Sequence, residues 1–300
     1  MQMRNVITLE SLGRQTCLLL VKQVLGIKNI KSRDTVMEGR TALLVFANHS
    51  LPERLCVSAA VRQMGGVLVY EAPNPLWRTE LEKFQRSLLP VFSYYVDCLY
   101  CYGLPVTDWM DNLQGLEFPI INAGCFNAHP AHVLADVACM QRIAKDVSRV
   151  TVGWIGCPNG SMHSAIVATT IFGFRLKIAT PPSVDTTDIR NFASSRQASV
   201  TFVEDPRKAV AGADFVIAGY GESLDEEERK KWIVSTALLQ EAAPHVKLLL
   251  GASPGRAVPV DEGLLANPAS LLSRQAENRL CVHKRLLRWV FENNEVSSNA

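Results

Sequence analysis

The sequence predicts an α/β protein built from two doubly wound parallel-sheet domains joined by a long helix. Short apolar segments of strand length alternate with segments of helical length, which is the pattern of parallel sheets covered by helices on both faces. The alternation occurs in two series, and a long helix predicted over residues 130–147 lies between them. With 300 residues, of which 48% are apolar, the chain is large enough for two domains that each bury a core.

The elements are predicted in the following order. A helix over residues 9–25 opens the first series, with strands at 42–46, 67–70, 98–102 and 119–122 and helices at 53–64, 80–88 and 106–114. The second series has strands at 151–155, 175–179, 199–203, 215–218 and 248–250 and helices at 161–172, 206–210 and 226–233. An amphipathic helix over residues 277–293 ends the pattern. The predicted domains are residues 1–132 and 133–276, with helix 277–293 packed back on the first.

Charge and composition exclude several classes of partner. A net charge of +2, from 31 basic and 29 acidic residues that are interspersed, gives no basic field for nucleic acid and no polybasic membrane patch. Because we find no apolar signal segment and no run of 18 apolar residues, we predict a cytoplasmic protein that does not bind membranes. The eight cysteines lie mostly in apolar segments, so we expect buried free thiols.

The turn after the first predicted strand has the order of an anion-binding loop, in which a strand, a polar turn and a helix N-terminus follow one another. Its residues favour a different arrangement. Ser50 suits the N-cap, Pro52 suits the first helical turn, and Glu53 completes an S-x-x-E capping box. Pro52 has no N–H to donate and Glu53 would repel a phosphate. We therefore expect a helix end that is closed by its own side chains.

Two histidines stand at the start of the long helix. His129 is predicted at the N-cap, with Pro130 as the first helical residue, and His132 follows within the first turn. Three interpretations are open: a metal site completed by Cys125, histidines that only cap the helix, and a catalytic pair. Because no fourth ligand stands at a clear spacing, we predict no metal and take His129 and His132 as catalytic residues.

The loop after the strand at 151–155 has a strand, glycines and a helix in the order of a dinucleotide site. It lacks the G-x-G-x-x-G spacing, and the following strand ends without an acidic residue that could bind a ribose. We therefore predict no cofactor, and a small-molecule substrate bound by the loops that follow the strands.

Four dispersed segments resemble motifs of the aspartate and ornithine carbamoyltransferases, in the family's order and over nearly the whole chain. They are Phe46-x-x-x-Ser50-x-x-x-Arg54, His129-Pro130-Ala131-His132, Gly156-x-x-Asn159 through His163-Ser164, and Gln275-Ala276-Glu277-Asn278-Arg279. The resemblance implies a carbamoyltransferase-like fold, with a carbamoyl-phosphate-type first domain and an amino-acid or second-substrate-type second domain. It also implies transferase activity in amino-acid metabolism and a homotrimer, in which the loop around Trp77 would serve a neighbouring subunit.

The resemblance also implies substrate-binding positions, and several are altered. Ser50 and Arg54 match the first motif, but Leu51-Pro52-Glu53 replaces its Thr-Arg-Thr. Tyr102 stands where the family has an Arg, and His132 stands where it has a Gln. Each charge-assisted hydrogen bond to a phosphate contributes roughly 1.5–3 kcal/mol, so these losses argue against tight binding of carbamoyl phosphate.

His129 and Arg279 match the family's motifs, and Arg279 resembles the Arg that contacts the carbamoyl end of the donor. In the second domain, the motif positions implied for the second substrate are altered as well. The substrate-binding residues that we predict are Ser50, Glu53, Arg54, Trp77, Tyr102, Asn159, His163, Ser223 and Ser253.

Three functions stay open. The residues favour a divergent enzyme of this fold that acts on a small amino- or ureido-containing metabolite through a remodelled phosphate site. His129 would polarise a carbonyl, His132 would move a proton and Arg279 would hold the polar end of the substrate. The alternatives are conventional transfer from carbamoyl phosphate to an amino-acid-like amine, and an inactive homologue that binds a metabolite or another protein.

Overall fold

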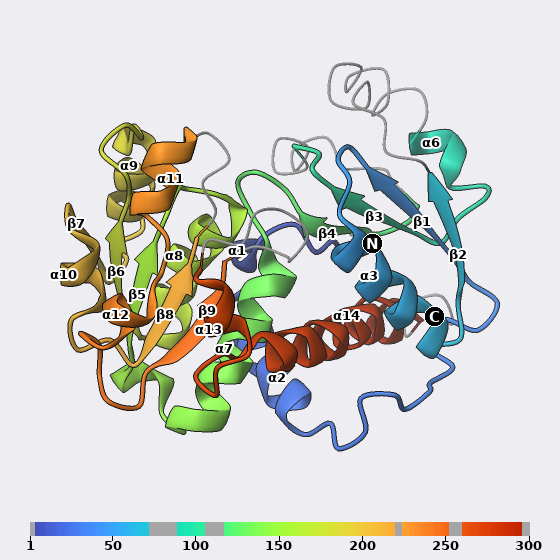
Figure 1. Cartoon of the computed structure of the whole chain (residues 1–300). Coiled ribbons are helices and arrows are strands. Elements are labelled where there is room, and N and C mark those ends of the chain that lie inside the picture. Colours follow the sequence, from blue (N-terminus) through green and yellow to red (C-terminus); the bar gives the residue numbers. More distant parts are fainter. Residues whose placement is uncertain (1–3, 72–88, 106–116, 220–223, 252–259, 296–300) are drawn as a thin grey trace. The chain divides into compact units, whose positions relative to one another are not determined.

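The computed structural model describes residues 4–71, 89–105, 117–219, 224–251 and 260–295 (Figure 1). The chain divides into two compact units, which we call the first unit (residues 1–134 and 277–300) and the second unit (residues 135–276). Trp77, Ser223 and Ser253 lie outside the described residues, as do the helices predicted at 80–88 and 106–114. Among the described helices, none is both long enough and apolar enough to cross a membrane.

The first unit contains a parallel sheet with the strand order β2-β1-β3-β4. Its strands are β1 (Thr41–Phe46), β2 (Val67–Glu71), β3 (Cys98–Tyr102) and β4 (Ile120–Gly124). Its helices are α1 (Leu9–Leu12), α2 (Arg14–Leu25), α3 (Leu51–Gln63) and α6 (Leu89–Phe92), with the start of α7 (Pro130–Ala144) and most of α14 (Leu272–Glu295). Strands β1 and β3 are almost completely buried, as expected for inner strands of a sheet covered on both faces.

Two predicted helices, 9–25 and 277–293, differ clearly from the structure. The helix predicted over residues 9–25 is interrupted at Gly13, whose φ of 78° ends α1 and begins α2. Glycine adopts a positive φ without the steric cost that a side chain adds, so the chain turns there. Helix α14 begins at Leu272 rather than at residue 277, because its apolar periodicity is weak in the first turn and carried no signal.

The second unit contains a parallel sheet with the strand order β7-β6-β5-β8-β9. Its strands are β5 (Thr151–Ile155), β6 (Arg175–Ala179), β7 (Val200–Val203), β8 (Phe215–Ala218) and β9 (Lys247–Leu250). Its helical segments are η3 (Val147–Arg149), α8 (Gly160–Phe172), α9 (Thr187–Ser195), α10 (Pro206–Val210), α11 (Glu226–Lys231), α12 (Thr236–Leu239) and α13 (Glu262–Leu265). The prediction of two parallel-sheet α/β domains is confirmed.

Helices α9, α12 and α13 were not predicted from the sequence. Each is short, and α9 buries only Ile189 and Ala193 among polar residues, so the apolar periodicity is too brief to stand out. Helix α8 is the opposite case. It is buried along almost its whole length, with Asn159 as N-cap and a left-handed Gly173 as C-cap, and its continuous apolar sequence was recognised.

Candidate functional site

A group of charged and polar side chains is buried in the first unit, and we call Glu53, His129, His132 and Arg279 the Glu53 cluster. Glu53 comes from the first turn of α3 and Arg279 lies on α14. His129 directly precedes α7, and His132 lies in the first turn of α7. Arg279 Nη1 donates to Glu53 Oε1 at 2.5 Å, and the two side chains are 5% and 0% exposed. The structure thus brings three predicted catalytic residues together around a carboxylate.

The helix end at Ser50 is not the capping box that we predicted. Ser50 is the N-cap residue of α3, but its side chain makes no capping hydrogen bond. The carboxylate of Glu53 enters the interior and pairs with Arg279 instead. The bond to the guanidinium joins two opposite charges, whereas a bond from the backbone N–H of Ser50 would leave the buried charge of Arg279 without this partner. The capping interpretation considered only local partners and was therefore wrong.

The loop from Asn122 to His129 is held by a buried amide. Asn122 Nδ2 donates to the carbonyls of Ile7 and Ala128 at 2.8 and 3.1 Å, and its Oδ1 accepts from Gly124 N at 2.8 Å. Gly124 has a φ of 139°, and a Cβ at this position would lie 2.8 Å from His129 Nε2. The glycine therefore gives the imidazole of His129 room to lie against the backbone at the end of β4.

His129 and His132 lie side by side. Their ring centroids are 5.1 Å apart, and His129 Nε2 lies 3.8 Å from Glu53 Oε1. Burial lowers the pKa of His129 below the ordinary histidine value, although the charge of Glu53 acts in the opposite direction. At neutral pH the imidazole is therefore uncharged, and it can donate a hydrogen bond from one nitrogen and accept one at the other.

His283 is a member of this environment that the sequence analysis missed. It is fully buried, and burial lowers its pKa to about 4. Its ring centroid lies 5.7 Å from that of Tyr100, whose pKa burial raises well above the ordinary value. One signal could have found it, because residues 279 and 283 are one helical turn apart and share a face of α14.

The remaining predicted residues of the first unit serve other contacts. Arg54 lies over the ring of Tyr70, at 4.7 Å from its centroid. Tyr102, at the end of β3, packs its ring against Phe46 with centroids 4.9 Å apart. Cys125, the third member of the metal set that we had considered, accepts a hydrogen bond from Asn122 Nδ2 at 3.4 Å and belongs to the apolar core.

Asn159 and His163 lie together in the second unit, at the N-terminus of α8. Asn159 Oδ1 accepts from Met162 N at 3.0 Å, and its Nδ2 lies 3.5 Å from the carbonyl of Gly251. His163 Nδ1 lies 3.0 Å from the carbonyl of Asn159, and its ring packs edge-on against Phe192. Burial lowers the pKa of His163, so this imidazole is also uncharged at neutral pH. Their contacts place both residues at the carboxyl end of β5, where parallel sheets bind ligands.

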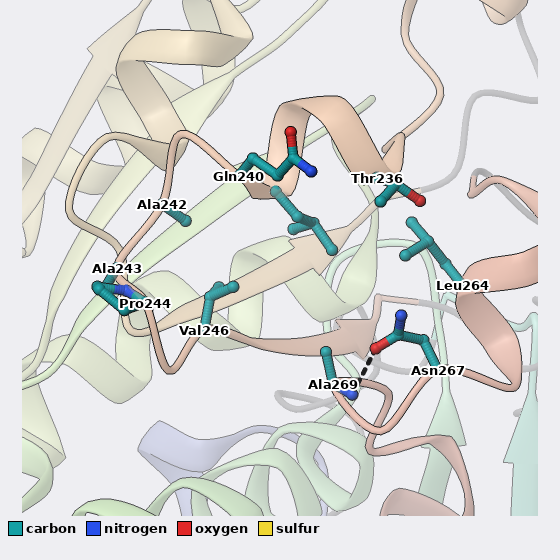
Figure 2. Close-up of a pocket in the computed structure, with 10 residues that line it drawn as sticks. Thr236, Gln240, Ala242, Ala243, Pro244, Val246, Leu264, Asn267 and Ala269 are labelled. Atoms are coloured by element: carbon teal, nitrogen blue, oxygen red, sulfur yellow. Dashed lines mark hydrogen bonds between the residues drawn. The ribbon is translucent and has the colours of Figure 1, made fainter.

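A pocket of about 350 Å³ in the second unit lies elsewhere (Figure 2). Thr236, Gln240, Val246, Leu264 and Asn267 are among the residues that line it. Residues 242–246 lead into β9 from its amino end. Because ligands in open α/β sheets bind at the carboxyl ends of the strands, this pocket is not the candidate active site.

Comparisons with known proteins cover both units. Residues 4–142 match the model of the aspartate/ornithine carbamoyltransferase carbamoyl-P binding domain, and residues 148–290 match that of the Asp/Orn binding domain. An ornithine carbamoyltransferase of Nitratidesulfovibrio vulgaris is 29% identical over 296 residues, which cover 94% of this chain and 97% of that protein. That of Bacillus subtilis is 26% identical over 309 residues, covering 99% of this chain and 96% of the relative.

Solved structures agree with these matches. The ornithine carbamoyltransferase from Pyrococcus furiosus is 25% identical, with a TM-score of 0.83 over 96% of this chain and 97% of that one. The enzyme from Thermus thermophilus is 20% identical, with a TM-score of 0.84 over 97% of this chain and 100% of that one, and at this identity it bears on the fold alone. On the evidence of both domain models, this chain belongs to the aspartate/ornithine carbamoyltransferase family.

Proposed function

We propose that this chain is an enzyme of the carbamoyltransferase family that acts on a small amino- or ureido-containing metabolite, and that its donor is not held as a phosphate dianion among arginines. The observation that supports this most directly is the contact between Glu53 and Arg279. A carboxylate of the protein already neutralises the guanidinium, and a second anion at that position would meet the charge of Glu53.

The Glu53 cluster can carry out the chemistry of a carbamoyl or ureido group. A neutral His129 can donate a hydrogen bond to a carbonyl oxygen and so stabilise the negative charge that develops there during attack by an amine. His132, whose ring centroid lies 5.1 Å from that of His129, is the proposed acceptor of the proton that the amine loses. Asn159 and His163 are the proposed contacts of the second substrate.

The second candidate is conventional transfer from carbamoyl phosphate to an amine such as ornithine. Two observations favour it. The similar proteins are ornithine carbamoyltransferases, and residues 4–142 match the model of a carbamoyl-P binding domain. In that case Glu53 would have to leave Arg279 when the donor binds. The two candidates therefore differ in one measurable property, which is the affinity of the resting protein for a phosphate-bearing donor.

A thermal-shift screen with carbamoyl phosphate, inorganic phosphate, ornithine and citrulline separates the candidates. A ligand that binds only the folded state stabilises it by about 2.7 kcal/mol at a hundred times its Kd. We expect citrulline or ornithine to raise the Tm. This rise should be lost in His129→Gln and retained in His245→Gln, since His245 is an exposed histidine of the second unit. Protection by micromolar carbamoyl phosphate would contradict the first candidate in favour of the second, and no shift with any ligand would favour an inactive homologue.

The Glu53→Gln variant tests the role of the carboxylate itself. Removing the charge frees Arg279 for an external anion, and one charge-assisted hydrogen bond is worth roughly 1.5–3 kcal/mol. We expect affinity for phosphate or carbamoyl phosphate to rise by about 10- to 100-fold. An unchanged or lower affinity would mean that Glu53 does not determine donor charge.

We also propose that the protein forms a homotrimer, as the family resemblance implies. The first unit exposes two apolar pairs, Leu51 and Leu55 on α3 and Val67 and Val69 on the edge strand β2, with exposures from 47% to 62%. Exposed apolar side chains of this kind are typical of a surface that binds another protein subunit. Light scattering should give three times the chain mass, and Leu55→Glu should reduce it. A monomeric wild type would refute the proposal.

A further inference from the structure

We infer that Glu53, His129 and His132 bind one divalent transition-metal ion of the zinc class. One ligand atom from each of the three side chains lies within 4.8 Å of the other two. All three residues are buried, with exposures of 0%, 8% and 2%. The carboxylate comes from the first turn of α3, His132 comes from the first turn of α7, and His129 is the residue that directly precedes α7.

The spacing is close to that of a metal-bound set. Zinc binds imidazole nitrogen and carboxylate oxygen at about 2.0–2.2 Å, which places neighbouring ligands in a tetrahedron about 3.4 Å apart. His129 Nε2 and Glu53 Oε1 are 3.8 Å apart, and the largest separation in the set is within 4.8 Å. Side-chain rotations that move the atoms by about 1 Å would therefore complete the geometry, and the backbone can stay in place.

The donor types select the ion. Two imidazoles and one carboxylate are the ligand set of catalytic zinc sites and of other first-row transition metals, which keep one position open for water or substrate. Magnesium and calcium prefer oxygen ligands, so this set disfavours them. Both imidazole rings are buried, and the neutral imidazole is the form of histidine that coordinates a metal.

Arg279 fits the role of an outer-shell partner. Carboxylates that bind a metal are themselves hydrogen-bonded, and such contacts fix their orientation. Arg279 Nη1 donates to Glu53 Oε1 at 2.5 Å. The charges of Glu53 and Arg279 cancel, so a bound ion leaves the site with an excess positive charge that an anionic or strongly polarised ligand would offset. In this way one ion could supply the positive charge that the altered first motif no longer provides.

Metal uptake is measurable without turnover, so this inference and the proposed function can fail separately. The full chain, first treated with EDTA, would be dialysed against Zn²⁺ and the bound metal measured, with Co²⁺ as a spectroscopic probe and Mg²⁺ as a negative control. We expect about one Zn²⁺ per chain, and a Co²⁺ absorption spectrum typical of nitrogen and oxygen ligands. His132→Gln should weaken the affinity at least ~10-fold, because even the loss of an outer-shell partner costs that much.

His245→Gln is the matched control. His245 also has a carboxylate neighbour, with Nε2 2.9 Å from Asp214 Oδ1. Among the described residues, this pair does not belong to a group of three possible metal ligands. Its replacement should leave the metal content unchanged. Absence of Zn²⁺ uptake by the wild type at about 100 μM, or equal uptake by folded His132→Gln, would overturn the inference. If His132→Gln does not fold, a wild-type Co²⁺ spectrum without nitrogen ligation would overturn it as well.

Discussion

The contact between Glu53 and Arg279 predicts strong, non-additive effects on stability. At 2.5 Å and an effective dielectric of about 20, two unit charges attract by about 6–7 kcal/mol, and much of this offsets the loss of hydration. Replacing one partner leaves the other charge buried without its counter-ion, which costs about 3–5 kcal/mol. Glu53→Leu and Arg279→Met should each lower the Tm by about 10 °C, at roughly 2–4 °C per kcal/mol for a unit of this size.

The double variant Glu53→Leu/Arg279→Met should be far more stable than the sum of the single effects, because it leaves no buried charge uncompensated. Thermal and urea unfolding in EDTA-containing buffer measure the four proteins without interference from metal ions. Glu226→Leu and Lys230→Met give the control cycle, since this exposed pair of α11, 2.8 Å apart, should couple by only ~0.3–0.5 kcal/mol. Additive losses in the Glu53/Arg279 cycle would refute the reasoning.

Three further predictions concern the first unit. Gly124→Ala should destabilise the protein more than Gly39→Ala, because both have a positive φ but only the first Cβ meets a side chain, at 2.8 Å from His129 Nε2; equal Tm losses would contradict this. Lys284→Met should lower the Tm, because Lys284 Nζ donates to the carbonyls of Ile30 and Ser32 and a hydrogen bond to a charged group contributes about 1.5–3 kcal/mol; an unchanged Tm would count against that role. Burial raises the pKa of Asp34, but its bond to Arg288 and two backbone N–H groups lower it by more, so the folded pKa lies below the unfolded one. The stabilisation is therefore present above the unfolded pKa and lost as the pH falls through the folded pKa. Urea unfolding should show Asp34→Asn less stable than wild type at about pH 7, with a difference that shrinks as the pH falls below about 4; a constant difference would contradict the assignment.

The fold followed from the sequence because parallel sheets leave a strong local pattern. Strands buried on both faces are continuously apolar, as in β1 and β5, and each is followed by a helix. The motif around His129 and Pro130 likewise marked the start of α7 at the correct residue. These features depend on neighbours within a few positions, so the order of residues is sufficient to predict them.

The site was only partly predictable, because its decisive contact joins residues 226 positions apart. The sequence identified His129, His132 and Arg279 by their motifs, but it assigned Glu53 to a local cap on Ser50. The tertiary structure instead places that carboxylate beside Arg279 and His129, with His283 nearby on α14. A buried charge takes the partner that best compensates it, wherever the fold brings that partner from. The sequence alone therefore determined the family resemblance and the strands, and only the packing of α3, α7 and α14 decided which charges meet.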